Sequence, residues 1–263
     1  MYNEIIFRPL YNGLIGIMNL LPWVDVGIAV IIFTVIVKVI LYPLSKSALL
    51  TQVRMKEIEP EATKIRSQYA NDKQLQAQKV MELYKLKKVK PFSGILLLII
   101  QLPILFALIS VFYKIIPTID TTLLYDFISV PVLKTMFLGI FDLTRPDSPV
   151  FYVLFLGFKV TSGLILGLAT GFVQFFQLKY SLASQTQASA PQKKSGVPDM
   201  ANIASSMNTQ MKYFVPILAF ASIYWIIPAT FPGASSIIAL YWMTSSLVTL
   251  LQELYIRKKH IRV

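Results

Sequence analysis

The chain has 263 residues, of which 55% are hydrophobic and 14% are charged, and its mean hydropathy is +0.62. Soluble domains carry about 25% charged residues, so this composition indicates a protein that crosses a membrane several times. The sequence has no cysteine, which excludes disulfides, thiolate metal sites and a thiol nucleophile. Its only histidine, His260, cannot by itself build a histidine metal cluster or a Ser-His-Asp triad. We expect neither an enzyme nor a bound metal or cofactor.

The net charge of +12 is distributed as expected for the two sides of a membrane, not for a nucleic-acid surface. Eleven basic and five acidic residues lie between Ser45 and Pro91, and four basic residues and one acidic residue lie in 179–212. The segment 114–147 holds three basic and four acidic residues. By the positive-inside rule the first two segments and the basic tail are cytoplasmic and the third is external. We expect no sequence-specific binding of nucleic acid.

The N-terminal segment 1–23 is apolar but interrupted by Arg8-Pro9, Asn12 and Asn19. These polar residues make it too broken to span a bilayer, and it lacks the basic start of a signal peptide. We interpret it as an external interfacial amphipathic helix whose aromatic residues suit the headgroup region. The alternative is an irregular external tail.

We predict an all-α polytopic membrane protein with five transmembrane helices, over residues 24–44, 92–113, 150–178, 213–230 and 235–252. The other segments are a cytoplasmic helical hairpin (45–91), an external segment (114–149), a cytoplasmic loop (179–212) and a basic cytoplasmic tail (253–263). The last two spans form one uncharged stretch of about 60 Å if helical, twice the ~30 Å bilayer core. The chain must therefore turn back near Pro228 and Pro232. Five spans place the N-terminus outside and the C-terminus in the cytoplasm.

Lys38 is the one charged residue in the apolar run from Val26 to Leu44. A lysine near the centre of a membrane helix costs roughly 2.5–3.5 kcal/mol, so we interpret it as part of a functional, water-filled cavity. The alternative is that its long side chain snorkels toward the nearer interface. Thr34 precedes Lys38 by one helical turn and shares its face, and Gln101 lies midway along the second span. A face with Thr34 and Lys38, opposed by Gln101, would form a polar groove inside lipid.

The cytoplasmic segment 45–91 has two apolar stripes at helical spacing, one including Met55, Ile58 and Ala62 and the other including Val80 and Tyr84. Asn71-Asp72 between them is a turn and cap signal, so the segment is predicted to form an antiparallel helical hairpin. The stripes could serve only to pack the two helices on each other. The other possibility is a docking surface for nascent chains, lipid headgroups or partner proteins.

Two features of the third span have structural interpretations. Gly163, Gly167 and Gly171 recur every four residues and indicate a face for close helix packing, within the protein or between copies of it. Lys159 could be a second charge within the membrane. Because residues 160–178 are already long enough to span, we interpret Lys159 as the outer boundary of the helix.

From Trp23 to Arg257 the sequence resembles the YidC/Oxa/Alb family of membrane protein insertases in its five-span bacterial form. The motifs that carry the resemblance are Thr34-Val35-Ile36-Val37-Lys38, Leu41-Tyr42-Pro43-Leu44, Asn71-Asp72-Lys73-Gln74, Leu83-Tyr84-Lys85, Gln101-Leu102-Pro103-Ile104 and Leu240-Tyr241-Trp242. Several motifs occur in the expected order and in matching topological places. The usual bacterial residue of the family at the position of Lys38 is arginine.

The resemblance implies an insertase in the bacterial cytoplasmic (inner) membrane, with a groove open to the cytoplasm and to lipid but closed outside. Carried over by position, Lys38 is the positive charge that attracts the polar tail of a substrate, Thr34 and Gln101 line the groove, and Tyr241 and Trp242 contact the substrate. The implied partners are nascent membrane proteins and the lipid bilayer, while a role for the Sec translocon or the ribosome stays open. The alternatives are a small solute or ion transporter with Lys38 in its binding site, and a structural membrane scaffold.

Overall fold

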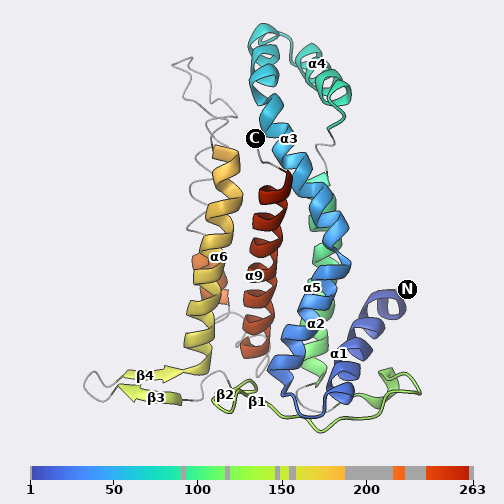
Figure 1. The fold of residues 1–263 in the computed structure, drawn as a ribbon, viewed down its shortest axis with the longest axis vertical. Helices are drawn as coiled ribbons and strands as arrows, with labels where there is room; N and C mark the ends of the chain where they lie inside the picture. The colour runs from blue at the N-terminus through green and yellow to red at the C-terminus, as the bar shows by residue number, and fades with distance from the viewer. Residues whose placement is uncertain are drawn as a thin grey trace.

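The computed structural model describes residues 2–89, 93–115, 119–145, 149–153, 158–186, 216–222 and 235–260, and most of them are helical. The long helices run side by side, with α9 (Ser235–His260) between α6 (Ser162–Thr186) on one side and α2 (Val26–Ile40) and α5 (Ser93–Ile115) on the other (Figure 1). The helical part of the fold prediction is confirmed for most of the described chain. Two short antiparallel pairs of strands were not predicted.

One described helix is long and apolar enough to cross a membrane by itself, the 24-residue stretch Ser236–Lys259 of α9. Half of its most apolar window is buried inside the protein. A second candidate is the pair formed by α2 and the first part of α3 (Tyr42–Gln68), which meet at a bend of 58°. Most of the predicted fourth span and the turn near Pro228 and Pro232 fall outside the described residues, although 216–222 are helical. The count of five spans stays a prediction.

The N-terminal segment forms a short π-helix, η1 (Asn3–Phe7), followed by α1 (Arg8–Leu20). The apolar face of α1 packs against the rest of the protein, since Tyr11, Leu14 and Ile15 are completely buried in the main hydrophobic core. This core continues into α2, α5 and α9. The segment is therefore helical and integral to the helix bundle, and its position relative to a bilayer stays a prediction.

Polar side chains of α1 organise the segment that follows α5. Asn12 is 2% exposed and uses all of its amide group. Its Nδ2 donates to the carbonyls of Arg8 and Leu123, both at 2.8 Å, and its Oδ1 accepts the N–H of Tyr125 at 2.8 Å. The Tyr11 hydroxyl accepts the N–H of Asp120 at 2.8 Å, and burial raises the pKa of this phenol. Backbone groups that no regular secondary structure satisfies are thus paired by α1.

The first turn of α2 is fixed to the hairpin of β1 (Met136–Phe137) and β2 (Phe141–Asp142). Asp25 is the N-cap of α2: its Oδ1 accepts the N–H of Ile28 at 2.9 Å and its Oδ2 accepts the N–H of Leu138 at 3.1 Å. The N–H of Val26, which no intrahelical acceptor can reach, donates to the carbonyl of Lys134 at 2.9 Å. The hairpin and α2 are therefore one structural unit.

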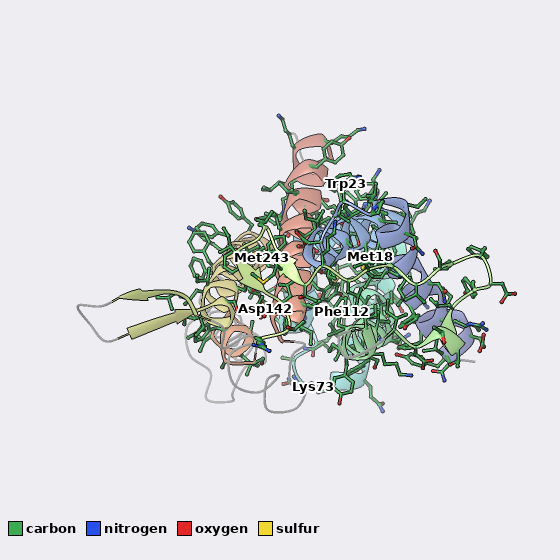
Figure 2. All side chains as sticks on the ribbon, turned by 90° about the horizontal axis from the view of Figure 1, so that it is seen from below. Met18, Trp23, Lys73, Phe112, Asp142 and Met243 are labelled. Atoms are coloured by element: carbon green, nitrogen blue, oxygen red, sulfur yellow. The ribbon has the colours of Figure 1, made fainter. Side chains whose placement is uncertain are left out.

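The predicted third span differs in its beginning. Strand β3 (Pro149–Val153) pairs antiparallel with β4 (Phe158–Thr161), and α6 begins only at Ser162. The helix thus begins twelve residues after the predicted start at residue 150, because an apolar run of β-branched and aromatic residues satisfies a strand as well as a helix. Figure 2 shows these two strands extending away from the helices. Lys159 lies on β4, outside α6.

The glycine face of α6 packs inside the protein. Gly163 and Gly167 are buried, and a β-carbon at Gly171 would lie 3.3 Å from the carbonyl oxygen of Pro216 in the helical segment 216–222. The close approach of these two segments explains the small residue at position 171. This geometry favours internal packing over a contact between copies of the chain.

Helices α3 and α4 (Lys73–Leu86) form a hairpin at the end of the bundle opposite to β1 and β2 (Figure 1). Asp72 caps α4 by accepting the N–H groups of Gln74 and Leu75, both at 3.0 Å. The hairpin has its own small apolar cluster, centred on Ile58, Tyr84 and Val89 and separate from the main core. Helix α3 has Pro60 in its interior, a residue that cannot donate a backbone hydrogen bond to the preceding turn.

Candidate functional site

Lys38 lies on the last turn of α2 and reaches across to α9. Its Nζ donates a hydrogen bond to Oγ1 of Thr249 at 3.1 Å, and its side chain is only partly buried. A cation in the last turn of a helix also interacts favourably with the partial negative charge of the helix C-terminus. The structure thus places the intramembrane lysine of the sequence prediction at the contact of two long helices.

The acceptor on α9 is oriented by its own helix. The Thr249 hydroxyl donates to the carbonyl of Ser245, one turn earlier, at 2.8 Å, and this leaves its oxygen lone pairs for the ammonium group. Three residues further along α9, Nε2 of Gln252 donates to the backbone carbonyl of Lys38 at 3.1 Å. Two hydrogen bonds therefore join α2 and α9 at the level of residue 38.

The charge on Lys38 has no acidic partner among the described residues, where no carboxylate oxygen lies within 4.0 Å of its Nζ. The nearest acidic residue along α9 is Glu253, one turn beyond Thr249, and its side chain is 4% exposed. Its Oε1 accepts the Nε–H of Arg257 at 3.1 Å, so the negative charge of Glu253 is already compensated. Lys38 is balanced in the described structure by dipoles and not by a counter-ion.

Thr34 is buried one turn before Lys38, and its hydroxyl donates to the carbonyl of Val30 at 2.6 Å. A hydroxyl bonded to its own helix in this way costs little inside an apolar environment. Gln101 lies on α5, and its side chain is outside the part of the structure that is described. Whether Gln101 faces Lys38 stays a prediction.

The two aromatic candidates on α9 differ in exposure. Tyr241 is 4% exposed in the main core, and its ring lies 6.1 Å from that of Phe112 on α5. Trp242 is partly buried and packs against the same core. Seven residues separate Trp242 from Thr249, which is almost two full turns, so Trp242 is the aromatic that shares the helix face of the Lys38 acceptor.

The predicted site residues leave out several polar side chains that the structure brings to this region. Thr249 and Gln252 contact Lys38, and together with Ser245 they are spaced by four and three residues, a pattern that places them on one helix face but does not show what that face contacts. On α6, Gln174 is 8% exposed and its Oε1 has no hydrogen-bond partner within the described residues. One turn earlier on α6, the Thr170 hydroxyl lies 3.2 Å from the carbonyl oxygen of Ala239 on α9. Polar side chains of α6 therefore also lie at its contact with α9.

The described residues contain no group of three His, Cys, Asp or Glu side chains that could hold a metal ion. The chemistry available at the α2–α9 contact is that of one cation, several hydroxyl and amide groups and an aromatic ring. Such an arrangement can attract an anionic or polar segment. It offers no pair of groups for acid–base or nucleophilic catalysis in the part of the chain that is described.

A family model described as 60Kd inner membrane protein matches residues 18–262 of the chain. The chain is 33% identical over 233 residues to a protein named membrane protein insertase YidC from Fusobacterium nucleatum, with 89% of this chain and 86% of that protein covered. It is 29% identical over 270 residues to a protein of the same name from Beijerinckia indica, covering 98% of this chain and 38% of the relative. A third protein of this name, from Rickettsia massiliae, is 27% identical over 238 residues, covering 88% of this chain and 35% of the relative. The chain spans little more than a third of these two longer relatives.

Proposed function

The chain belongs to the 60Kd inner membrane protein family, the YidC/Oxa family that its sequence motifs resemble, and from this premise we propose that it inserts membrane proteins into the lipid bilayer and helps them fold. The substrate enters through a hydrophilic groove open to the cytoplasm, in which Lys38 is the positive charge. Relatives named membrane protein insertase that match most of this chain support the proposal.

The observation that carries the mechanism is the hydrogen bond from Lys38 to a neutral hydroxyl in place of a carboxylate. An ammonium group without a counter-ion among the described residues can pair with a carboxylate of an incoming polar tail. At an effective dielectric near 20 and a separation of 4 Å, this attraction is about 4 kcal/mol before desolvation. Such a pairing recruits the tail without trapping it. The apolar part of the substrate then leaves sideways into lipid, and no nucleotide or metal is needed.

The other predicted residues have supporting roles in this proposal. Thr34 and Gln101 line the groove, and Trp242 contacts the substrate from the helix face that also carries Thr249. Tyr241 is buried against Phe112, so its contact with a substrate requires α5 and α9 to separate. This requirement makes Trp242 the first aromatic contact of the substrate.

We further propose a multi-pass topology of five spans, with the N-terminus outside and the C-terminus in the cytoplasm. The α3–α4 hairpin and the segment 119–145 lie at opposite ends of the helix bundle (Figure 1), which supports their placement on opposite sides of the bilayer. The partners are nascent membrane proteins and the lipid bilayer. Contacts with the Sec translocon or the ribosome are separate questions that binding assays can answer.

The test is an insertion assay with a single-span substrate whose translocated tail carries acidic residues. Lys38→Arg is expected to keep activity, because a positive charge and not a particular geometry recruits the tail. Lys38→Ala and Lys38→Glu are expected to reduce insertion of the acidic-tail substrate. Insertion by Lys38→Glu should recover when the substrate tail carries lysines in place of its acidic residues. Full activity of Lys38→Glu on the acidic tail would refute the charge mechanism. Solute flux into proteoliposomes without any inserted substrate would instead support a transporter.

A further inference from the structure

The side chain of Lys38 needs a reason to stay at the helix contact. Lysine has a flexible four-carbon stem, and Lys38 lies only two residues before the end of α2 at Ile40. From such a position a lysine in lipid usually extends its ammonium group toward the nearer interface. In the structure the ammonium group points to α9 instead, and the hydroxyl of Thr249 at 3.1 Å is its acceptor there.

The Thr249 hydroxyl suits this task because its own hydrogen is already used. It donates to the carbonyl of Ser245 at 2.8 Å, so the oxygen presents only lone pairs to Lys38. A hydroxyl that donates one hydrogen bond becomes a better acceptor of another. A second hydrogen bond, from Gln252 to the backbone carbonyl of Lys38 at 3.1 Å, also joins α2 and α9 but does not involve the ammonium group.

We propose that Thr249 is a positioning residue that holds the Lys38 ammonium group against α9, and that this placement gives the site its preference for substrate tails with carboxylates. The inference rests on the proposed function and deepens it. An ammonium group has three N–H donors, and one of them is used by Thr249. The other two face a substrate carboxylate, which binds a fixed cation better than one that moves between the groove and the headgroups.

The experiment compares two substrates that differ only in the translocated tail, one with Asp and Glu residues and one with Asn and Gln at the same positions. The measured quantity is the ratio of their insertion efficiencies in proteoliposomes. Thr249→Val keeps the shape of the side chain but removes the acceptor, and it is expected to lower this ratio by roughly tenfold, the size of effect that the loss of one hydrogen bond to a charged group produces. Thr249→Ser keeps the hydroxyl and should keep the ratio.

Gln252→Leu is the matched control, since it removes a hydrogen bond between the same two helices that does not involve the ammonium group. Its ratio should stay near that of the wild type. An unchanged ratio in Thr249→Val, or an equal fall in Gln252→Leu, would overturn the proposed role of the hydroxyl. Lys38→Ala is measured alongside: if it alone abolishes the acid preference while Thr249→Val does not, the charge mechanism stands and the positioning role fails. If Lys38→Ala keeps the preference, the charge mechanism fails first.

Discussion

The ring of Phe137 lies so close to Gly27 that a β-carbon built on Gly27 would come within 2.4 Å of Phe137 Cδ2. Gly27 is on the first turn of α2, and Phe137 is the buried residue of β1. Together with the Asp25 carboxylate, which bonds both α2 and the β1–β2 hairpin, this contact fits the hairpin onto the start of the helix. The other end of α2 carries Lys38, so the hairpin fixes the helix on which the charged site is built.

Gly27→Ala is therefore expected to destabilise the protein. The added methyl group would overlap Cβ, Cγ and Cδ2 of Phe137, which belongs to strand β1. Overpacking of this kind costs about 1–3 kcal/mol. Thermal unfolding in detergent measures the effect. Gly16→Ala on α1 is the control, because its β-carbon would meet its nearest neighbour, Ile128 Cδ1, at an ordinary 3.9 Å. An equal loss of stability in the two variants would contradict the interpretation of the Phe137 contact.

Asn12→Leu is expected to destabilise the segment that follows α5. The substitution leaves the partly buried N–H of Tyr125 without its acceptor, at about 1–3 kcal/mol for the unsatisfied group, and leaves the carbonyl of Leu123 with only Nε of Arg8 as a donor, at 3.2 Å. Limited proteolysis should then cleave residues 119–145 faster, while the main core stays resistant. Asn19→Leu serves for comparison, since its hydrogen bond to Ser129 is exposed. Faster cleavage in both variants to the same extent would show that burial of Asn12 does not matter.

The rest of the protein is expected to fold without the α3–α4 hairpin but to need it for capture of substrates. The hairpin's apolar cluster of Ile58, Tyr84 and Val89 is distinct from the main core, and the ion pair of Glu61 with Lys87 is internal to the hairpin. Replacing 55–84 by a short Gly-Ser linker should leave a protein that is monodisperse in detergent but does not integrate substrates.

Hydrogen exchange on the intact protein completes the hairpin test, because an element with few contacts to the core should exchange faster than α9. Wild-type insertion by the deletion variant would show that the hairpin is dispensable. Protection of α4 equal to that of α9 would show that it is rigidly attached.

The parts of the structure that depend on local chemistry could be predicted from the sequence. The Asn71-Asp72 signal indicates a cap, and Asp72 caps α4. Lys38 stands out in its apolar run, and it lies at a contact between long helices. The apolar stripe of α1 was also visible, but a stripe does not say whether lipid or protein will cover it, and in the structure Tyr11 and its neighbours are covered by protein.

The structural features that could not be predicted from the sequence depend on contacts between residues far apart along the chain. In 119–145 the backbone N–H groups of Tyr125 and Leu138 donate to the side chains of Asn12 and Asp25, more than a hundred residues earlier. Thr249 is one of many hydroxyls in apolar segments, and nothing local distinguishes it from those that bond only to their own helix. Only the alignment of α2 with α9 selects it as the acceptor for Lys38.

The last prediction concerns the two ends of the bundle and uses the absence of native cysteine. Ser67 on α3 and Asp126 in the segment after α5 are both exposed and lie in segments at opposite ends of the bundle (Figure 1). Single cysteines at these positions, and at Ser195, which lies outside the described residues, are treated with a membrane-impermeant thiol reagent in sealed cells. We expect labelling at position 126 only, because the basic segments stay on the cytoplasmic side. Permeabilised cells provide the control in which positions 67 and 126 both react. Labelling of position 67 or 195 from outside would reverse the orientation and, with it, the cytoplasmic opening proposed for the Lys38 groove.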